Sequence, residues 1–149
     1  MQLKNSPTLP ALANEVLAVS GSDEDLRRLR ATFEGSSWEL RTAQTVAAAR
    51  ASLRANRTPV VLCASHLPDG DWKTLLQLTD ELAHRPKLIV FSRNADDRLW
   101  SEVLNSGGFD VLPFPADRME IFRSVSSAWR NWRDCAAEHT SKAVAVHSL

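Results

Sequence analysis

The sequence predicts an α/β fold in which helices cover both faces of a five-stranded parallel sheet. Five short runs with the character of strands recur along the chain, and each is followed by apolar residues at helical spacing. Such strict alternation is typical of parallel sheets with right-handed crossovers. The length of 149 residues and the hydrophobic content of 44% suit a single domain with one core.

The strands are predicted from their apolar patterns. Residues 16–19, 60–63 and 88–91 are fully apolar, as expected for strands that are buried on both faces. Residues 38–41 alternate apolar with polar side chains, which favours a strand at the edge of the sheet. Residues 111–112 predict a short fifth strand.

The helices are predicted from capping patterns and apolar stripes. Residues 22–25 resemble a capping box, Asp96 or Asp97 can cap the fourth helix, and Asp117 begins a capping box for the last helix. A loop is predicted at residues 68–71, where Pro, Asp and Gly gather. The successive stripes are Leu26, Leu29 and Phe33; Val46, Ala49 and Leu53; Leu75, Leu78 and Leu82; Leu99, Val103 and Leu104; and Ile121, Val125, Ala128 and Trp132.

The ends of the chain lack these patterns. Residues 1–14 are predicted to be a flexible leader, residues 15–137 the domain, and residues 138–149 a C-terminal tail.

The composition excludes several classes of function. Basic and acidic residues number 18 each, so no general attraction to nucleic acid or to anionic membranes is expected. No apolar stretch is long enough to span a bilayer. Cys63 and Cys135 are isolated and provide neither a metal-binding spacing nor a disulfide framework. A cytoplasmic location follows as the expectation.

Three local motifs resemble those of one protein family. They are LPDGD at residues 67–71, SRNADD at residues 92–97 and SGGFDVLPFP at residues 106–115. In this order and at these spacings, residues 15–132 resemble the receiver domain of bacterial response regulators. The resemblance implies a flavodoxin-like, doubly wound sheet with strand order 2-1-3-4-5, and a role in a two-component phosphorelay.

The residues that carry the chemistry of that family are replaced. By this resemblance, the acidic pair that holds Mg²⁺ falls on Ser20 and Gly21, the phosphoacceptor on Ala64, and the phosphate-binding Lys on Phe114. Ser92 keeps a hydroxyl, whereas the small residue expected after it is Arg93. Mg²⁺ prefers hard, charged oxygen ligands, and a methyl group cannot attack phosphorus. No metal, cofactor or catalytic residue is therefore expected.

The sequence leaves three functional hypotheses. The first is a phosphorylation-independent signalling module that binds a protein partner or a second copy of itself. The alternative is a sensor domain whose vacated pocket accepts a small neutral ligand. An enzyme of the same architecture is the third, although the sequence offers no paired base and nucleophile and no G-x-G-x-x-G motif.

Other polar residues have a structural and a functional interpretation. Asp23 and Asp25 are expected to support the start of a helix, and Asp69 and Asp71 to belong to a turn; substitute cation binding is the competing hypothesis. His66 lies near the vacated phosphoacceptor position and is expected to be an ordinary loop residue, because no carboxylate or Ser partner is evident.

Trp100, Trp129 and Arg130 are the candidates for a partner surface, since Trp and Arg are favoured at interfaces. Receivers resemble one another in using the surface of their fourth helix, fifth strand and fifth helix for such contacts. Packing against the rim of the core is the competing interpretation for Trp129, and Trp132 is expected to be core.

Overall fold

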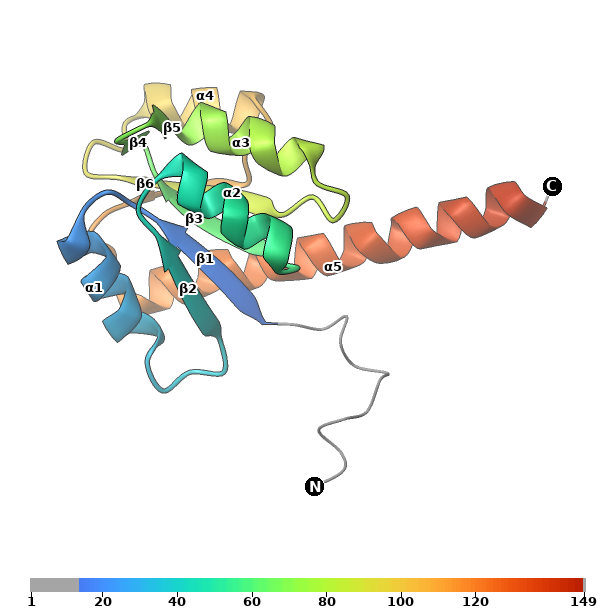
Figure 1. Cartoon of the computed structure of the whole chain (residues 1–149), viewed down its shortest axis with the longest axis horizontal. Helices are drawn as coiled ribbons and strands as arrows, with labels where there is room; N and C mark the ends of the chain where they lie inside the picture. Colours follow the sequence, from blue (N-terminus) through green and yellow to red (C-terminus); the bar gives the residue numbers. More distant parts are fainter. Residues whose placement is uncertain (1–13, 149) are drawn as a thin grey trace.

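The computed structural model describes the backbone of residues 14–148 and the side chains of residues 14–136. Five parallel strands form the main sheet in the order β2-β1-β3-β6-β7 (Figure 1). When only these strands are counted along the chain, this is the predicted order 2-1-3-4-5. The strands are β1 (Glu15–Val19), β2 (Glu39–Ala43), β3 (Val60–Ala64), β6 (Lys87–Ser92) and β7 (Asp110–Pro113).

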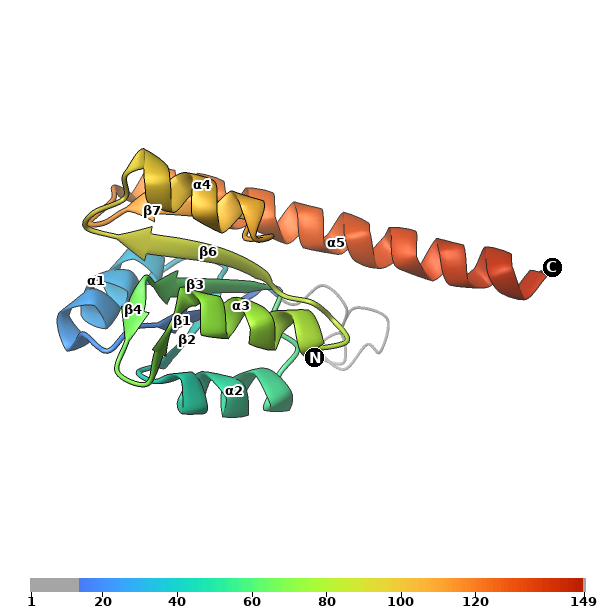
Figure 2. The same ribbon diagram turned by 90° about the horizontal axis from the view of Figure 1, so that it is seen from above.

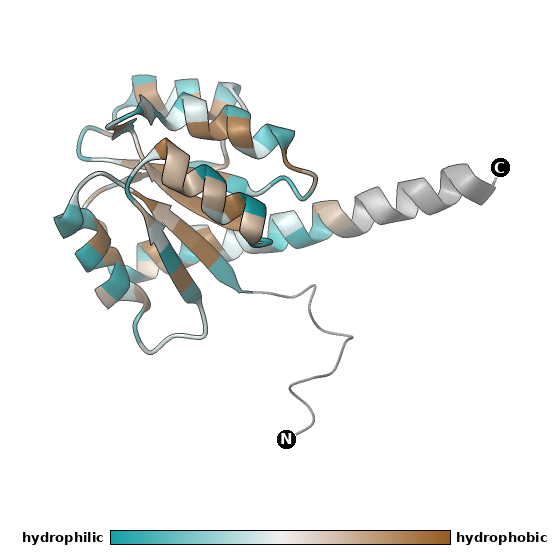
Figure 3. Cartoon of the chain, in the orientation of Figure 1, coloured by the Kyte–Doolittle hydropathy of each residue, from teal (hydrophilic) through white to brown (hydrophobic). Residues whose placement is uncertain are grey.

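Helices cover both faces of the sheet, as predicted (Figure 2). One face packs against α1 (Asp23–Phe33) and α5 (Arg118–Ser148). The other packs against α2 (Val46–Ala55), α3 (Trp72–Glu81) and α4 (Asp97–Asn105). Hydrophobic residues follow the strands and the inner faces of the helices, with polar residues outside (Figure 3).

The central strands are buried on both faces. In β1, Val16 and Ala18 belong to the core beneath α1 and α5, whereas Leu17 and Val19 belong to the core beneath α2 and α3. Each Val or Leu that is fully buried in this way contributes about 1.5–3 kcal/mol. The alternation in β2 reflects its place at the edge, where only Ala43 is buried.

The prediction of a loop at residues 68–71 is wrong in part. Residues 70 and 71 form β5 (Gly70–Asp71), which pairs with β4 (His66–Leu67) as a small antiparallel hairpin, and only residues 68 and 69 are the turn between the two strands. Strands of two residues are too short to show an alternating pattern in the sequence. The hairpin stands at the carboxyl end of β3, so it forms part of the rim of the site.

The last helix continues beyond the sheet. Trp132 is buried, and α5 runs on to Ser148, through most of the segment predicted as a tail (Figures 1 and 2). The predicted leader, apart from Asn14, lies outside the described residues, as does Leu149. Within the described part of the chain, no helix is both long and apolar enough to cross a membrane.

Candidate functional site

A pocket of about 550 Å³ lies at the carboxyl ends of the strands. This is where ligands bind in open parallel sheets, because the loops that follow the strands meet there. Ser20 follows β1, Ala64 and Ser92 end β3 and β6, and Phe114 follows β7. The pocket therefore brings together all five positions singled out in the sequence: Ser20, Gly21, Ala64, Ser92 and Phe114.

Ser20 and Gly21 form the part of the pocket beside α1. The buried Ser20 hydroxyl donates to Asp25 Oδ2 at 3.2 Å and accepts from the Ser22 backbone N–H at 3.1 Å. A Cβ on Gly21 would stand 2.9 Å from two carbons of the Pro68 ring, which lies in the turn of the β4–β5 hairpin. The close approach of Pro68 therefore requires glycine at position 21.

Asp25 lies in the first turn of α1, as predicted, and has a further role that the sequence did not show. Ser22 caps α1 by accepting from the Asp25 backbone N–H at 3.2 Å, but the Asp25 carboxylate is directed into the pocket. Its side chain is only 6% exposed and lies 2.9 Å from Arg93 Nη2. Sequence reasoning missed this pair because its two residues are 68 positions apart.

Arg93 places a cation at the mouth of the pocket. Its side chain extends from the loop after β6 across to α1 and is 58% exposed. The hydrogen bond to Asp25 and the charge of that carboxylate raise the pKa of Arg93 above its ordinary value. The guanidinium is therefore permanently charged.

The opposite wall is apolar. Phe91 and Phe114 pack with their ring centroids 4.8 Å apart, and Ala64 lines the pocket beside them. Phe114 is buried, its backbone N–H donates to the Ser92 carbonyl at 3.0 Å, and the Phe114–Pro115 bond is cis. This wall presents no charge to a bound group.

Ser92, Ser65 and His66 form a hydrogen-bonded row along the rim. Ser65 Oγ lies 3.3 Å from Ser92 Oγ and 3.2 Å from His66 Nδ1. The expectation that His66 has no Ser partner is therefore wrong: the adjacent Ser65 supplies one. Among the described residues no carboxylate forms a hydrogen bond or an ion pair with the imidazole, so the orienting group of a catalytic triad is missing.

The donor set does not fit Mg²⁺. Asp69 accepts from the backbone N–H groups of Val46 at 2.7 Å and Ala47 at 3.2 Å, so it supports the start of α2. These hydrogen bonds lower the pKa of Asp69 below its ordinary value. Asp71 caps α3 in a reciprocal capping box with Thr74. The one carboxylate that lines the pocket, Asp25, is already paired, and no cluster of three metal-ligating side chains occurs in the described part of the chain.

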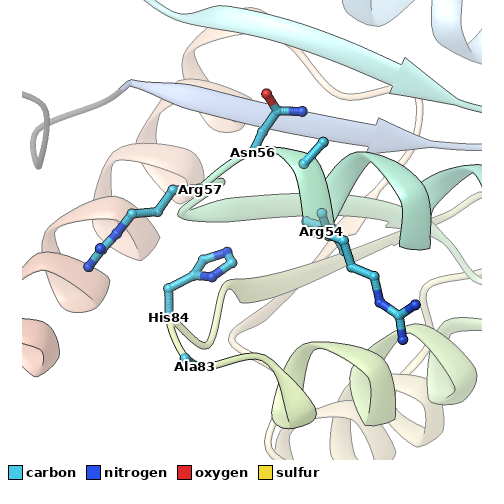
Figure 4. A pocket seen from close by; sticks show the side chains of 7 residues that line it. Arg54, Asn56, Arg57, Ala83 and His84 are labelled. Atoms are coloured by element: carbon cyan, nitrogen blue, oxygen red, sulfur yellow. The ribbon is translucent and has the colours of Figure 1, made fainter.

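A second pocket, of about 320 Å³, lies near the amino ends of β3 and β6 (Figure 4). It is lined by Leu53, Arg54, Ala55, Asn56, Arg57, Ala83 and His84. Arg54 and Arg57 point away from each other (Figure 4), and Arg57 lies 5.6 Å from the centre of the Trp132 ring. The His84 carbonyl accepts from Trp132 Nε1 at 2.7 Å. The region therefore anchors α5 and does not direct its cations toward a common ligand.

The candidate partner residues lie on two helices, Trp100 on α4 and Trp129 and Arg130 on α5. Trp100 is 49% exposed on α4. Trp129, on the other face of the sheet, packs edge to face on Trp38, with ring centroids 6.4 Å apart, and Arg133 lies 5.2 Å from its ring centre. Arg130 is exposed, with Nη2 3.5 Å from Ser127 Oγ. Trp129 thus fits the competing interpretation as a rim residue, and Trp100 is the more exposed indole.

Comparison with solved structures identifies the architecture. The signal receiver domain of a LuxO repressor protein from Vibrio parahaemolyticus superposes with a TM-score of 0.76 at 16% identity, over 82% of this chain and 94% of that one. The chain has the fold of a receiver domain. The receiver domain of an HD domain-containing protein from Pseudomonas fluorescens Pf-5 also gives a TM-score of 0.76, at 21% identity, over 85% and 93% of the two chains.

A third match is the beryllofluoride-activated NtrC4 receiver domain dimer, with a TM-score of 0.74 at 19% identity, over 80% of this chain and 98% of that one. No family model and no curated protein matches the sequence. The receiver fold is thus established by shape, while the pocket residues differ from the family pattern described above.

Proposed function

We propose that this chain is a receiver-like module of a two-component pathway that acts in the cytoplasm through protein contacts and is not phosphorylated. The observation that carries the proposal is Ala64, which ends β3 inside the pocket where the resemblance requires the phosphoacceptor. Its methyl group cannot bond to phosphorus. No catalytic role is assigned to the domain.

The surroundings of Ala64 support the same conclusion. Phosphoryl transfer depends on cations that stabilise the charge of the transferred group. Phe114 offers a ring where the family has an amine, and Ser20 and Gly21 offer no carboxylate for a metal ion. The guanidinium of Arg93 is already bound to Asp25.

The partner is a protein or a second copy of the chain. The NtrC4 match is a dimer of receiver domains, which supports self-association as one form of the proposal. Trp100 is the best-placed anchor, because a half-exposed indole on a helix gains much from burial in an interface. Trp100→Ala should then weaken partner binding while leaving the fold intact.

The test of the proposal is direct phosphorylation. The purified protein is incubated with Mg²⁺ and acetyl phosphate and its mass is measured, with a receiver domain that has the complete acidic pocket as the positive control. We expect an unchanged mass. A stoichiometric gain of one phosphoryl group would overturn the proposal.

A small-ligand sensor is the second candidate, and the form of the pocket favours it. A volume of about 550 Å³ is within the range of roughly 300–1,000 Å³ that is typical of ligand sites. Its apolar wall faces the hydroxyls of Ser22, Ser65 and Ser92. A neutral ligand should raise the melting temperature in a metabolite screen, and Ala64→Leu, which narrows the pocket, should reduce that shift.

A further inference from the structure

The ion pair between Asp25 and Arg93 crosses the pocket and joins two segments that are distant in sequence. Asp25 lies in the first turn of α1, and Arg93 lies in the loop that leads from β6 to α4. Both residues line the pocket, and Arg93 Nη2 and Asp25 Oδ1 are 2.9 Å apart. The pair therefore connects the start of α1 with the loop after the fourth strand of the main sheet.

The Asp25 carboxylate is buried, so its charge needs a partner. A buried charge is costly unless it is paired and hydrogen-bonded. The Asp25 side chain is 6% exposed, and its recorded partners are the Arg93 guanidinium and the Ser20 hydroxyl at 3.2 Å. Without Arg93, a hydroxyl dipole alone would face the charge.

Two hydrogen bonds hold the loop after β6 on either side of Arg93. The Asn94 backbone N–H donates to Ser92 Oγ at 3.1 Å, and Asp96 caps α4 by accepting from the Leu99 backbone N–H at 2.9 Å. Arg93 thus lies between a hydroxyl that fixes the start of the loop and the cap that begins α4.

We propose that the Arg93 guanidinium occupies a cation-binding site formed by Asp25 and Ser20, and that this ion pair holds the β6–α4 loop against α1. We call the binding site the seat and the ion pair the latch. The seat accepts a guanidinium, and the chain supplies its own. The latch holds the pocket and the start of α4 in one arrangement. This inference goes beyond the proposed function and does not depend on it, since the latch concerns the loop and not the acceptance of phosphate.

Amide hydrogen exchange in a double-mutant cycle tests the latch. Arg93→Ala and Asp25→Asn should each raise the exchange rate of the Asn94 amide by about tenfold, and the double variant should add little to either change. The matched control is Arg28→Ala, which removes an exposed ion pair with Glu24 on the same helix and should leave the Asn94 amide unchanged. Independent, additive effects of the two substitutions, or no effect of either, would overturn the proposal.

Chemical rescue tests the seat. Ethylguanidinium at millimolar concentration should restore slow exchange of the Asn94 amide in Arg93→Ala and should have no effect on the Asp25→Asn/Arg93→Ala variant. Arg93→Met keeps an aliphatic side chain but removes the charge, so it separates the effect of the charge from that of packing. Its Asn94 amide should respond to ethylguanidinium as that of Arg93→Ala does. The proposed cation-binding site is contradicted if ethylguanidinium does not slow the exchange of the Asn94 amide in Arg93→Ala, or if it slows this exchange equally in the variant that also lacks the Asp25 carboxylate. None of these readouts involves phosphorylation, so failure here is distinct from failure of the proposed function.

Discussion

At the scale of single residues, the pocket combines positions that the sequence predicts with a contact that it does not. Ser20, Ala64 and Ser92 could be placed because each ends or directly follows a strand, and the ends of parallel strands meet at one edge. The Asp25–Arg93 pair could not, because the direction of a side chain in a first helical turn depends on its tertiary partner. The pattern at residues 22–25 predicts the cap and the place of Asp25 in the first turn, but not the pairing of its carboxylate with Arg93.

Gly21 gives a prediction at this scale. Gly21→Asp places a Cβ 2.9 Å from the Pro68 ring and should lower the free energy of unfolding by about 1–3 kcal/mol, the usual range for overpacking. Urea denaturation measures the change. In a Pro68→Ala background the same substitution should cost less, because the ring carbons are gone. An equal loss in both backgrounds would show that the ring is not the cause.

At the scale of elements, the β4–β5 hairpin is the main feature that the sequence does not predict. This hairpin connects the site to α2. Asp69 lies in the turn of the hairpin and accepts hydrogen bonds from two backbone N–H groups at the start of α2, where Thr45 is the cap. A turn composition predicted the bend, but the sequence does not reveal that the carboxylate reaches a helix 23 residues away.

Asp69 therefore predicts a pH-dependent contribution to stability. Because its folded pKa is lowered, the carboxylate stabilises the fold above the ordinary Asp pKa of about 3.9. That contribution is lost as the pH falls through the lower folded value. Asp69→Asn should therefore melt below the wild type at pH 7, with the difference shrinking below about pH 4. A difference that stays constant across this range would contradict the assignment.

The docking of α5 supplies a second prediction at this scale. Trp132 is buried, and its Nε1–H donates to the His84 carbonyl at 2.7 Å. Trp132→Ala should reduce the free energy of unfolding by about 3–5 kcal/mol. Trp132→Phe keeps much of the packing and should lose about 1–3 kcal/mol, because the carbonyl loses its partner. Chemical denaturation separates the two values, and equal losses would mean that the packing of the ring contributes nothing beyond the hydrogen bond.

At the scale of the whole molecule, the alternation of strand and helix patterns predicts the parallel sheet and its helical layers, and the resemblance to receiver domains implies the strand order. The burial of β1, β3 and β6 on both faces leaves continuous apolar runs, and these are the clearest signals in the chain. The partner surface was harder, because one sequence does not show which side of a rim helix a residue occupies. Trp129 turned toward Trp38, whereas Trp100 stayed exposed.

Whether a single substitution can restore phosphorylation also depends on the whole molecule, since accepting a phosphoryl group requires residues from several loops. Ala64→Asp supplies a nucleophile beside the apolar wall of Phe91 and Phe114. Gly21 has no room for a carboxylate that could hold Mg²⁺ while Pro68 packs on it. The new aspartate would therefore lack the cations that phosphoryl transfer needs, and incubation with labelled acetyl phosphate and Mg²⁺ should leave it unlabelled. Circular dichroism provides the control that the variant is folded, and a labelled, folded Ala64→Asp protein would show that the pocket retains more of the chemistry than its residues indicate.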